Sequence, residues 1–337
     1  MLRLRNFGVV LAAASLFPLA LVGSVPAAAV PQVTKTITLH APSALNSSWG
    51  LVSAIGYGTA AAKLGTSLGG DGGGITYGPS YGTQTPDKTW WYLDVAKKRL
   101  AHYSKTGAYL GQVKVPTKYL DQGLYLQYQN PQALKNGSIV LMGTDVSGAR
   151  LLVMSKTHHF TSVKLKQWVS VHSTDGTSLY GFNTGDQTVR LNPTTGKITT
   201  VTWMRGQGGR RFSLAVGSGS VTIKRPGVNL KLKLVSAEHP TKTPHPQLEA
   251  TMGADGRLWV LISAIIELTS TDYADAVGLV SISASGHVSA VQPVRSLTSA
   301  SDPADGLHLG IRYGGTKPWL MFIGTDAARV YRLKWWR

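Results

Sequence analysis

The 337-residue sequence contains no cysteine, which excludes disulfides, cysteine-based zinc sites and thiol nucleophiles. Acidic residues are also scarce: 16 Asp and Glu stand against 34 Lys and Arg, and no Glu occurs between positions 30 and 237. Only 15% of the residues are charged while 43% are hydrophobic, so the chain is not a disordered polyelectrolyte. What remains is a basic globular protein with one large domain or two ordinary ones.

The first 29 residues have the three-part plan of a secretory signal peptide. Arg3 and Arg5 precede an apolar run over residues 7–23, and small residues follow at 27–29, where cleavage is expected. An uncleaved N-terminal anchor is the alternative, but the run is short for a membrane span and contains Pro18. No later apolar stretch reaches spanning length. We therefore expect a secreted, extracellular protein with a bacterial-type signal peptide at 1–29.

The net charge of +18 is concentrated in one part of the chain. Residues 205–245 hold eight basic residues and one acidic residue, whereas residues 246–337 hold eight of each. Residues 30–204 carry +9 over a stretch four times as long as 205–245. A basic surface formed by residues 205–245 would attract an anionic partner.

A repeated hairpin organises residues 30–337. Glycine is frequent, at 38 residues, and short alternating segments are bounded by Gly, Asp and Asn, which is typical of strands joined by tight turns. Copies of the hairpin begin at Asp87, Asn136, Asp175, Ser220, Asp255 and Lys317. Each follows another strand-like piece, at 74–77, 124–128, 168–172, 212–216, 248–252 and 307–313. Six units of four strands predict an all-β fold, a six-bladed β-propeller in a single domain, with seven blades as the alternative.

The last unit supplies only three strands before the chain ends. The segment Thr34–His40 alternates and stands alone near the start of the mature chain, so we expect this N-terminal strand to complete the last blade. Residues 41–72 fit the repeat least well. They are assigned as an insertion or as a degenerate blade.

The best copy of the repeat, residues 90–113, reads WWYLDVAKKRLAHYSKTGAYLGQV. It resembles NHL-type and SMP-30-like β-propeller repeats, which place an apolar strand, an Asp, an Arg next to an apolar residue and a Gly turn in this order. The resemblance is good over one blade, partial over four and poor over 41–72. SMP-30-like lactonases hold a metal with acidic and amide side chains around the pore. Because residues 30–237 contain no Glu, the acidic ligand expected in the first blade is missing.

Four aspartates precede an arginine by three to five residues at the same hairpin of different units. They are Asp94, Asp145, Asp186 and Asp326. The favoured interpretation is structural: the carboxylate accepts backbone N–H bonds in the turn and pairs with the arginine. The alternative is a ring of carboxylates that binds a cation such as Ca²⁺. His239 and His245, near Glu238 in a proline-rich connector, form a second alternative metal site.

The segment Arg205–Arg211 is the best candidate for anion binding, because glycines expose backbone N–H groups beside three guanidinium groups. Lysines follow at alternating positions, which project to one face of a strand. The candidate ligand-binding residues are Arg205, Arg210, Arg211, Lys224, Arg225, Lys231 and Lys233.

We therefore expect a secreted, monomeric binding protein that recognises an anionic extracellular or cell-wall ligand, with no specific nucleic-acid partner. The alternative is an enzyme of lactonase, lyase or glycan-cleaving type with its site at the pore. The sequence identifies neither a catalytic residue nor a cofactor, and Ca²⁺ is the one metal considered.

Overall fold

The computed structural model describes residues 30–41, 48–65, 67–68, 76–77, 82–120, 131–145, 148–291, 307–323 and 327–334. The predicted signal peptide lies outside these residues. All the described strands belong to one compact unit, Gln32–Arg337. That unit is almost entirely β-structure, with α1 (Thr117–Leu120) and the 3-10 turn η1 (Gln207–Gly209) as its helical elements among the described residues. No described helix has the length and apolarity needed to cross a membrane.

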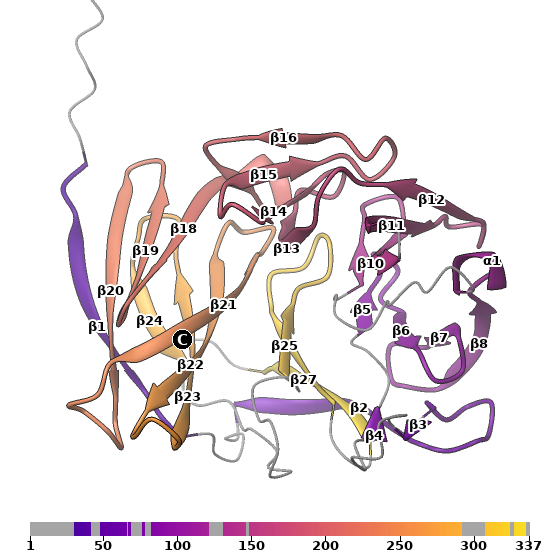
Figure 1. The fold of residues 1–337 in the computed structure, drawn as a ribbon, viewed down its shortest axis with the longest axis horizontal. Coiled ribbons are helices and arrows are strands. Elements are labelled where there is room, and N and C mark those ends of the chain that lie inside the picture. The colour runs from indigo at the N-terminus through magenta and orange to yellow at the C-terminus, as the bar shows by residue number, and fades with distance from the viewer. Residues whose placement is uncertain are drawn as a thin grey trace, which may run out of the picture. The chain divides into compact units, whose positions relative to one another are not determined.

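The strands form sheets that follow one another along the chain and are antiparallel except for one edge pair in the fourth sheet (Figure 1). The first sheet contains β5 (Gly82–Gln84), β6 (Trp90–Asp94), β7 (Arg99–Tyr103) and β8 (Tyr109–Lys114). The second contains β9 (Gln132–Ala133), β10 (Ile139–Asp145), β11 (Gly148–Met154) and β12 (Phe160–Lys164). The third contains β13 (Val169–Thr174), β14 (Leu179–Asn183), β15 (Thr188–Leu191) and β16 (Ile198–Thr200).

The later sheets use the N-terminal part of the chain as well. The fourth contains β17 (Met204–Arg205), β18 (Arg211–Gly217), β19 (Ser220–Arg225), β20 (Val228–Ser236) and β1 (Val33–Leu39). The fifth contains β21 (Pro244–Met252), β22 (Leu258–Glu267), β23 (Tyr273–Ile282) and β24 (Val288–Val291). The sixth contains β25 (Leu307–Gly310), β26 (Trp319–Ile323), β27 (Ala327–Leu333) and β2 (Trp49–Gly56). A two-stranded pair joins β3 (Ser67–Leu68) to β4 (Thr76–Tyr77).

Apolar clusters connect successive sheets, because strands whose side chains alternate across a buried sheet can pack on both faces. One cluster joins the first and second sheets, and another joins the second and third. A large cluster joins the fourth and fifth sheets and includes Tyr180 from the third. Further clusters join the fifth sheet to the sixth and the sixth sheet to the first. Consecutive four-stranded sheets that pack face to face in this way are the arrangement of a β-propeller.

The expected role of Thr34–His40 is wrong. The strand β1 pairs in parallel with β20 of the fourth sheet, with Val33 opposite Leu230 and Leu39 opposite Ser236. The last sheet is instead completed by β2, which lies within the poorly fitting stretch 41–72 and runs antiparallel to β27.

The distribution of apolar side chains explains this exchange. The last sheet is covered on both faces, and β2 supplies buried Trp49 to one cluster and buried Ile55 to the other. In contrast, β1 offers Ile37 and Leu39 on one face and exposed threonines on the other. A strand with one polar face suits the edge of a sheet that is solvated on one side.

In three sheets, the strand that begins the sheet also differs from the segment predicted to precede the hairpin. The first sheet begins with β5 at 82–84, whereas residues 76–77 form β4 and pair with β3. In the second sheet the strand that pairs with β10 on this side is β9, and the predicted strand at 124–128 lies outside the described residues. In the fourth sheet, residues 212–216 belong to the second strand, and the two-residue β17 precedes them.

Candidate functional site

Five of the seven predicted anion-binding residues lie on one exposed face of the fourth sheet. In β18 and β19, exposed or half-buried residues alternate with the buried residues Phe212, Leu214, Val221 and Ile223, so one face is solvated. Cross-strand partners share a face of a sheet. The solvated face, here called the basic face, carries Arg205, Arg211, Lys224, Lys231 and Lys233, all of them exposed.

The five cations form a diagonal row across four strands. Arg205 is opposite Arg211, and Lys224 pairs with Ser213, two residues along β18 from Arg211. On β20, Lys231 lies two residues beyond the partner of Lys224, and Lys233 lies two residues further. Diagonal neighbours in a sheet are about 7–8 Å apart. With a rise of about 3.3 Å per residue, the row extends over roughly 25 Å.

No acidic residue occurs in any of the five strands of this sheet. The cations are instead flanked by hydroxyl groups: Lys231 lies between Thr222 and Thr34, and Lys233 lies between Ser220 and Thr36. The positive charge of the basic face is therefore not neutralised within its own sheet, and it is available to an external anion.

The other two predicted residues face the fifth sheet. Arg225 is 7% exposed and donates to the carbonyl oxygens of Gly256, Ser283 and Ile282 at 2.7, 2.8 and 3.2 Å. Burial, helped by the charge of Arg210, lowers the pKa of Arg225. Arg210 packs against the backbone of Gly256. Arg225 therefore fastens the fourth sheet to the fifth, whereas Arg210 stays exposed beside Gly256.

The predicted metal-binding residues are placed apart. Asp94 is fully buried, accepts N–H bonds from Gly65 and Lys97, and pairs with Arg99 at 2.8 Å. Arg99 also donates to Ala61 O and Lys63 O. In this unit, the structural interpretation of the aspartate–arginine pair is confirmed.

The remaining aspartates and histidines make no comparable cluster. Asp186 is exposed in the turn between β14 and β15, His239 follows β20, and His245 is exposed on β21. The side chain of Asp145 and all of Asp326 lie outside the described residues. Over the described ranges, no group of three or more His, Cys, Asp or Glu side chains is arranged to hold a metal ion.

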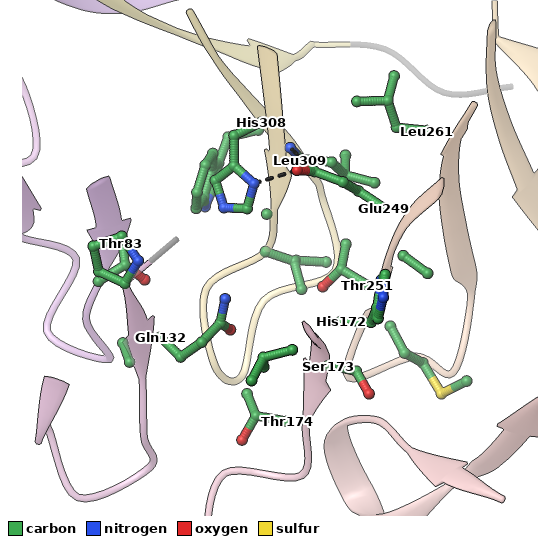
Figure 2. Close-up of a pocket in the computed structure, with 18 of the residues that line it drawn as sticks. Thr83, Gln132, His172, Ser173, Thr174, Glu249, Thr251, Leu261, His308 and Leu309 are labelled. Atoms are coloured by element: carbon green, nitrogen blue, oxygen red, sulfur yellow. Dashed lines mark hydrogen bonds and ion pairs between the residues drawn. The ribbon is translucent and has the colours of Figure 1, made fainter. Parts of the chain in front are cut away.

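A pocket of about 330 Å³ lies where the inner strands β5, β9, β13, β21 and β25 come together (Figure 2). Its wall combines hydroxyl and amide side chains, such as those of Thr83, Gln132 and Thr251, with as many apolar residues. Among the described residues that line it, Glu249 is the one acidic residue and none is Lys or Arg. The volume is in the range of small-molecule sites.

Glu249 and His308 form a pair at the top of this pocket, from β21 and β25 (Figure 2). The Oε2 atom of Glu249 lies 2.9 Å from His308 Nδ1 and accepts the N–H of Leu309 at 2.6 Å. Burial by itself would raise the pKa of Glu249, but the charge and hydrogen bond of His308 and the Leu309 N–H outweigh it. The pKa of Glu249 is therefore lowered, and the carboxylate stays ionised.

His172, on β13, lines the same pocket. The pairing of β13 with β14 shifts between Val171 and Ser173, so His172 sits at a β-bulge, a feature that redirects a side chain. Its ring packs edge-on against Phe182, and its Nε2 lies 3.3 Å from Ser170 Oγ. Burial lowers the pKa of His172, although Glu249 acts in the opposite direction. The described wall of the pocket thus holds one carboxylate and two imidazoles, a set that can exchange protons or hydrogen bonds with a ligand.

A family model described as "Domain of unknown function (DUF7485)" matches residues 47–333. The chain belongs to this family. No curated protein sequence matches the chain.

Several solved structures are similar in fold. Virginiamycin B lyase from Staphylococcus aureus is 12% identical, with a TM-score of 0.41 over 76% of this chain and 95% of that chain. Hydrazine synthase from Kuenenia stuttgartiensis is 12% identical, with a TM-score of 0.46 over 76% of each chain. A protein of unknown function from Bacteroides thetaiotaomicron is 14% identical, with a TM-score of 0.46 over 84% and 75%. Because these TM-scores are below 0.5, the likenesses carry no argument about activity.

Sequence reasoning did not single out Glu249, His308 or His172. All three lie in segments predicted as the strand that precedes a hairpin copy, at 248–252, 307–313 and 168–172. In a propeller these are the inner strands, whose polar side chains face the centre. A polar residue in such a strand was the feature of the sequence that could have pointed to this pocket.

Proposed function

We propose that this protein is secreted and binds an extended polyanion outside the cell through the basic face of the fourth sheet. The ligand class is a cell-wall or other extracellular polymer with phosphate or carboxylate groups. The observation that carries this proposal is the diagonal row of five exposed cations on strands without a single acidic residue.

The geometry favours a linear polymer over a small anion. The cations are spaced at about 5–8 Å along a line, so successive charges of an extended chain can each meet one cation. The two arginines offer bidentate donors, whereas the three lysines act as point charges. A small anion would contact only one or two of them. Because the side chains project from a sheet, the row exists before the ligand binds, which reduces the ordering cost.

The scaffold for this face is a single, monomeric domain that we propose to be a closed six-bladed propeller. The support is the pairing of β2 with β27, together with the apolar cluster between the sixth and first sheets. In this arrangement the N-terminal part of the chain closes the ring without a disulfide. Intact-mass measurement of exported protein should give a chain that starts near Val30, and a mass beginning at Met1 would contradict the signal peptide.

The binding test uses two defined polymers, long-chain polyphosphate and polygalacturonate. Affinity is measured by isothermal titration calorimetry between about 20 and 300 mM NaCl, a range over which exposed charges become strongly screened. Wild-type protein should bind at low salt and weaken steeply as salt rises. Double replacement of Lys231 and Lys233 by Gln should weaken binding at low salt and flatten the salt dependence.

The matched control replaces Lys156 and Lys164 by Gln. These exposed lysines lie in the turn between β11 and β12 and at the end of β12, and their loss removes the same charge from the protein. The control should bind like wild type. Absence of binding to both polymers at low salt, or equal weakening by both double variants, would refute the assignment of the basic face.

A further inference from the structure

Two arginines of the sixth sheet converge on the beginning of the first sheet. Arg312, in the loop after β25, donates through Nη1 to the carbonyl oxygens of Pro86 and Tyr313 at 3.0 and 3.1 Å. Arg332, on β27, donates through Nη2 to Gln84 Oε1 at 2.9 Å. Gln84 is the last residue of β5 and lies two residues before Pro86. The two guanidinium groups therefore reach positions about 7 Å apart along the chain.

Lys334 adds a third cation beside Arg332. The two residues are two positions apart at the end of β27, so their side chains project to the same face. Gly50 is the cross-strand partner of Arg332, and a Cβ atom at Gly50 would run into the side chain of Lys334. The lysine side chain therefore lies over Gly50, next to Arg332. Glycine leaves the space that this position of Lys334 requires.

The sixth sheet offers these cations no counter-charge, since its described strands contain no Asp or Glu. Asp87 follows the segment that the arginines reach, but its Oδ1 atom accepts from Thr85 Oγ1, Thr89 N and Thr89 Oγ1 within its own turn. Burial and the positive charge of Arg312 lower the pKa of Arg332, because the two guanidinium groups repel each other. Like charges partly removed from water favour an anion between them.

Both arginines have donors in excess of those that the fold uses. A guanidinium group has five N–H groups on three nitrogens. Among the described residues, the hydrogen bonds of Arg312 involve Nη1 alone and those of Arg332 involve Nη2 alone. Both side chains are half-buried, so their remaining N–H groups are partly desolvated. Two guanidinium groups match the tetrahedral oxygens and the double charge of a phosphate group better than the single charge of a carboxylate.

We propose that Arg312 and Arg332, assisted by Lys334, form a binding site for a phosphate group, either inorganic phosphate or the phosphate of a small monoester. The site lies between the sixth and first sheets, whereas the basic face belongs to the fourth. It binds one dianion, in contrast to the row of cations that meets a polymer. This inference goes beyond the proposed function, and neither site depends on the other.

The test titrates inorganic phosphate, glycerol 3-phosphate and acetate into the full chain by isothermal titration calorimetry, at low salt and about pH 8, where phosphate carries close to two negative charges. At least one of the two phosphate compounds should bind saturably to one site, at least tenfold more tightly than acetate, which has a single charge. Tighter binding of the free ion identifies inorganic phosphate as the ligand, and the reverse order identifies a monoester. The bound anion should also raise the melting temperature, because it binds the folded chain.

Three variants assign the binding to this site. Arg312→Gln and Arg332→Gln each remove one guanidinium group and should weaken phosphate binding about ten- to hundredfold, the effect expected for hydrogen bonds to a charged group. Lys334→Gln removes the exposed third cation and should weaken it about threefold. Arg211→Gln, on the basic face, removes the same charge and is the control, which should bind phosphate like wild type. Arg332→Gln should in turn bind polygalacturonate like wild type.

Thermal melting without added anion checks that each variant is folded. The proposal is overturned if neither phosphate compound binds more tightly than acetate, or if a folded arginine variant binds phosphate as tightly as wild type. Where neither arginine variant folds, unchanged binding by Lys334→Gln overturns it. Weaker phosphate binding after the double replacement of Lys231 and Lys233, or in Arg211→Gln, would place the ion on the basic face and also overturn it. Loss of polymer binding alone would refute only the role of the basic face.

Discussion

Replacement of Asp94 by Ala is expected to be the most destabilising single change among the predicted sites. The carboxylate is fully buried and makes three contacts: Gly65 N at 3.0 Å, Lys97 N at 3.3 Å and Arg99 Nε at 2.8 Å. Its partner Arg99 is 2% exposed. The substitution therefore leaves a buried guanidinium without its counter-charge.

Removal of one partner from a buried ion pair typically costs about 3–5 kcal/mol. Asp94→Asn should cost less, about 2 kcal/mol, because the amide oxygen still accepts the N–H of Gly65, although the amide NH2 takes the place of Oδ2 and the hydrogen bond from Arg99 is lost. The double variant with Arg99→Met should be more stable than the sum of the two single changes predicts, since it leaves no unpaired charge. Urea unfolding followed by tryptophan fluorescence measures each free energy, and Trp90 and Trp91 lie on the same strand as Asp94.

The matched control is Asp186→Asn at the equivalent hairpin of the third sheet. Asp186 is exposed and has a φ of 55°, a conformation that Asn also tolerates, so its replacement should change stability by less than about 0.5 kcal/mol. If Asp94→Asn and Asp186→Asn cost the same, or if Asp94→Ala costs under about 1 kcal/mol, the buried pair does not stabilise the fold as argued. A melting temperature that Ca²⁺ raises in wild type, but not in Asp94→Ala, would favour the cation-binding alternative.

Two further outcomes are expected. Burial lowers the pKa of His172 from 6.5, so as the pH falls the unfolded chain takes up this proton before the folded chain does. The free energy of unfolding should therefore be fully present above about pH 6.5 and should fall as the pH drops below it. His172→Gln should reduce the loss measured by urea unfolding between about pH 7.5 and 5.5. Part of that loss should remain because burial also lowers the pKa of His102, and an unchanged loss in the variant would contradict this account. Arg225→Met should lower the free energy of unfolding by about 2–3 kcal/mol, because three buried carbonyl groups lose their donor. The control is Lys224→Met at the exposed neighbouring position, which should change the free energy of unfolding by under about 0.5 kcal/mol. Equal costs for the two would mean that Arg225 does not fasten the fourth sheet to the fifth.

Local pattern was enough to predict most of the hairpins and their succession. Alternation of apolar and polar residues, interrupted by Gly, Asn and Asp turns, identifies most hairpins, because each hairpin is closed by residues close in sequence. Asp94 and Arg99 pair across one such turn, so their spacing already indicated the contact. The alternation of Lys231 and Lys233 likewise placed both on one face of a strand.

Pairing between distant segments was not predictable in this way. An alternating strand such as β1 can join any free sheet edge, and the choice between β20 and β27 depends on which edge leaves its polar face in water. That β2 rather than β1 completes the last sheet follows from how many faces of each sheet are covered by neighbouring sheets. The sequence of a single segment does not contain this information.

The sequence by itself determined an all-β chain of repeated hairpins with its positive charge concentrated in residues 205–245. Only the tertiary structure decided that five of those cations share one face while Arg225 is buried against the fifth sheet, since that depends on register and on the neighbouring sheet. Only the tertiary structure brought Glu249 to His308, 59 residues away in the chain. Hairpins are encoded by neighbours in sequence, whereas a pocket at inner strands arises from the packing of separate sheets, which periodicity does not specify.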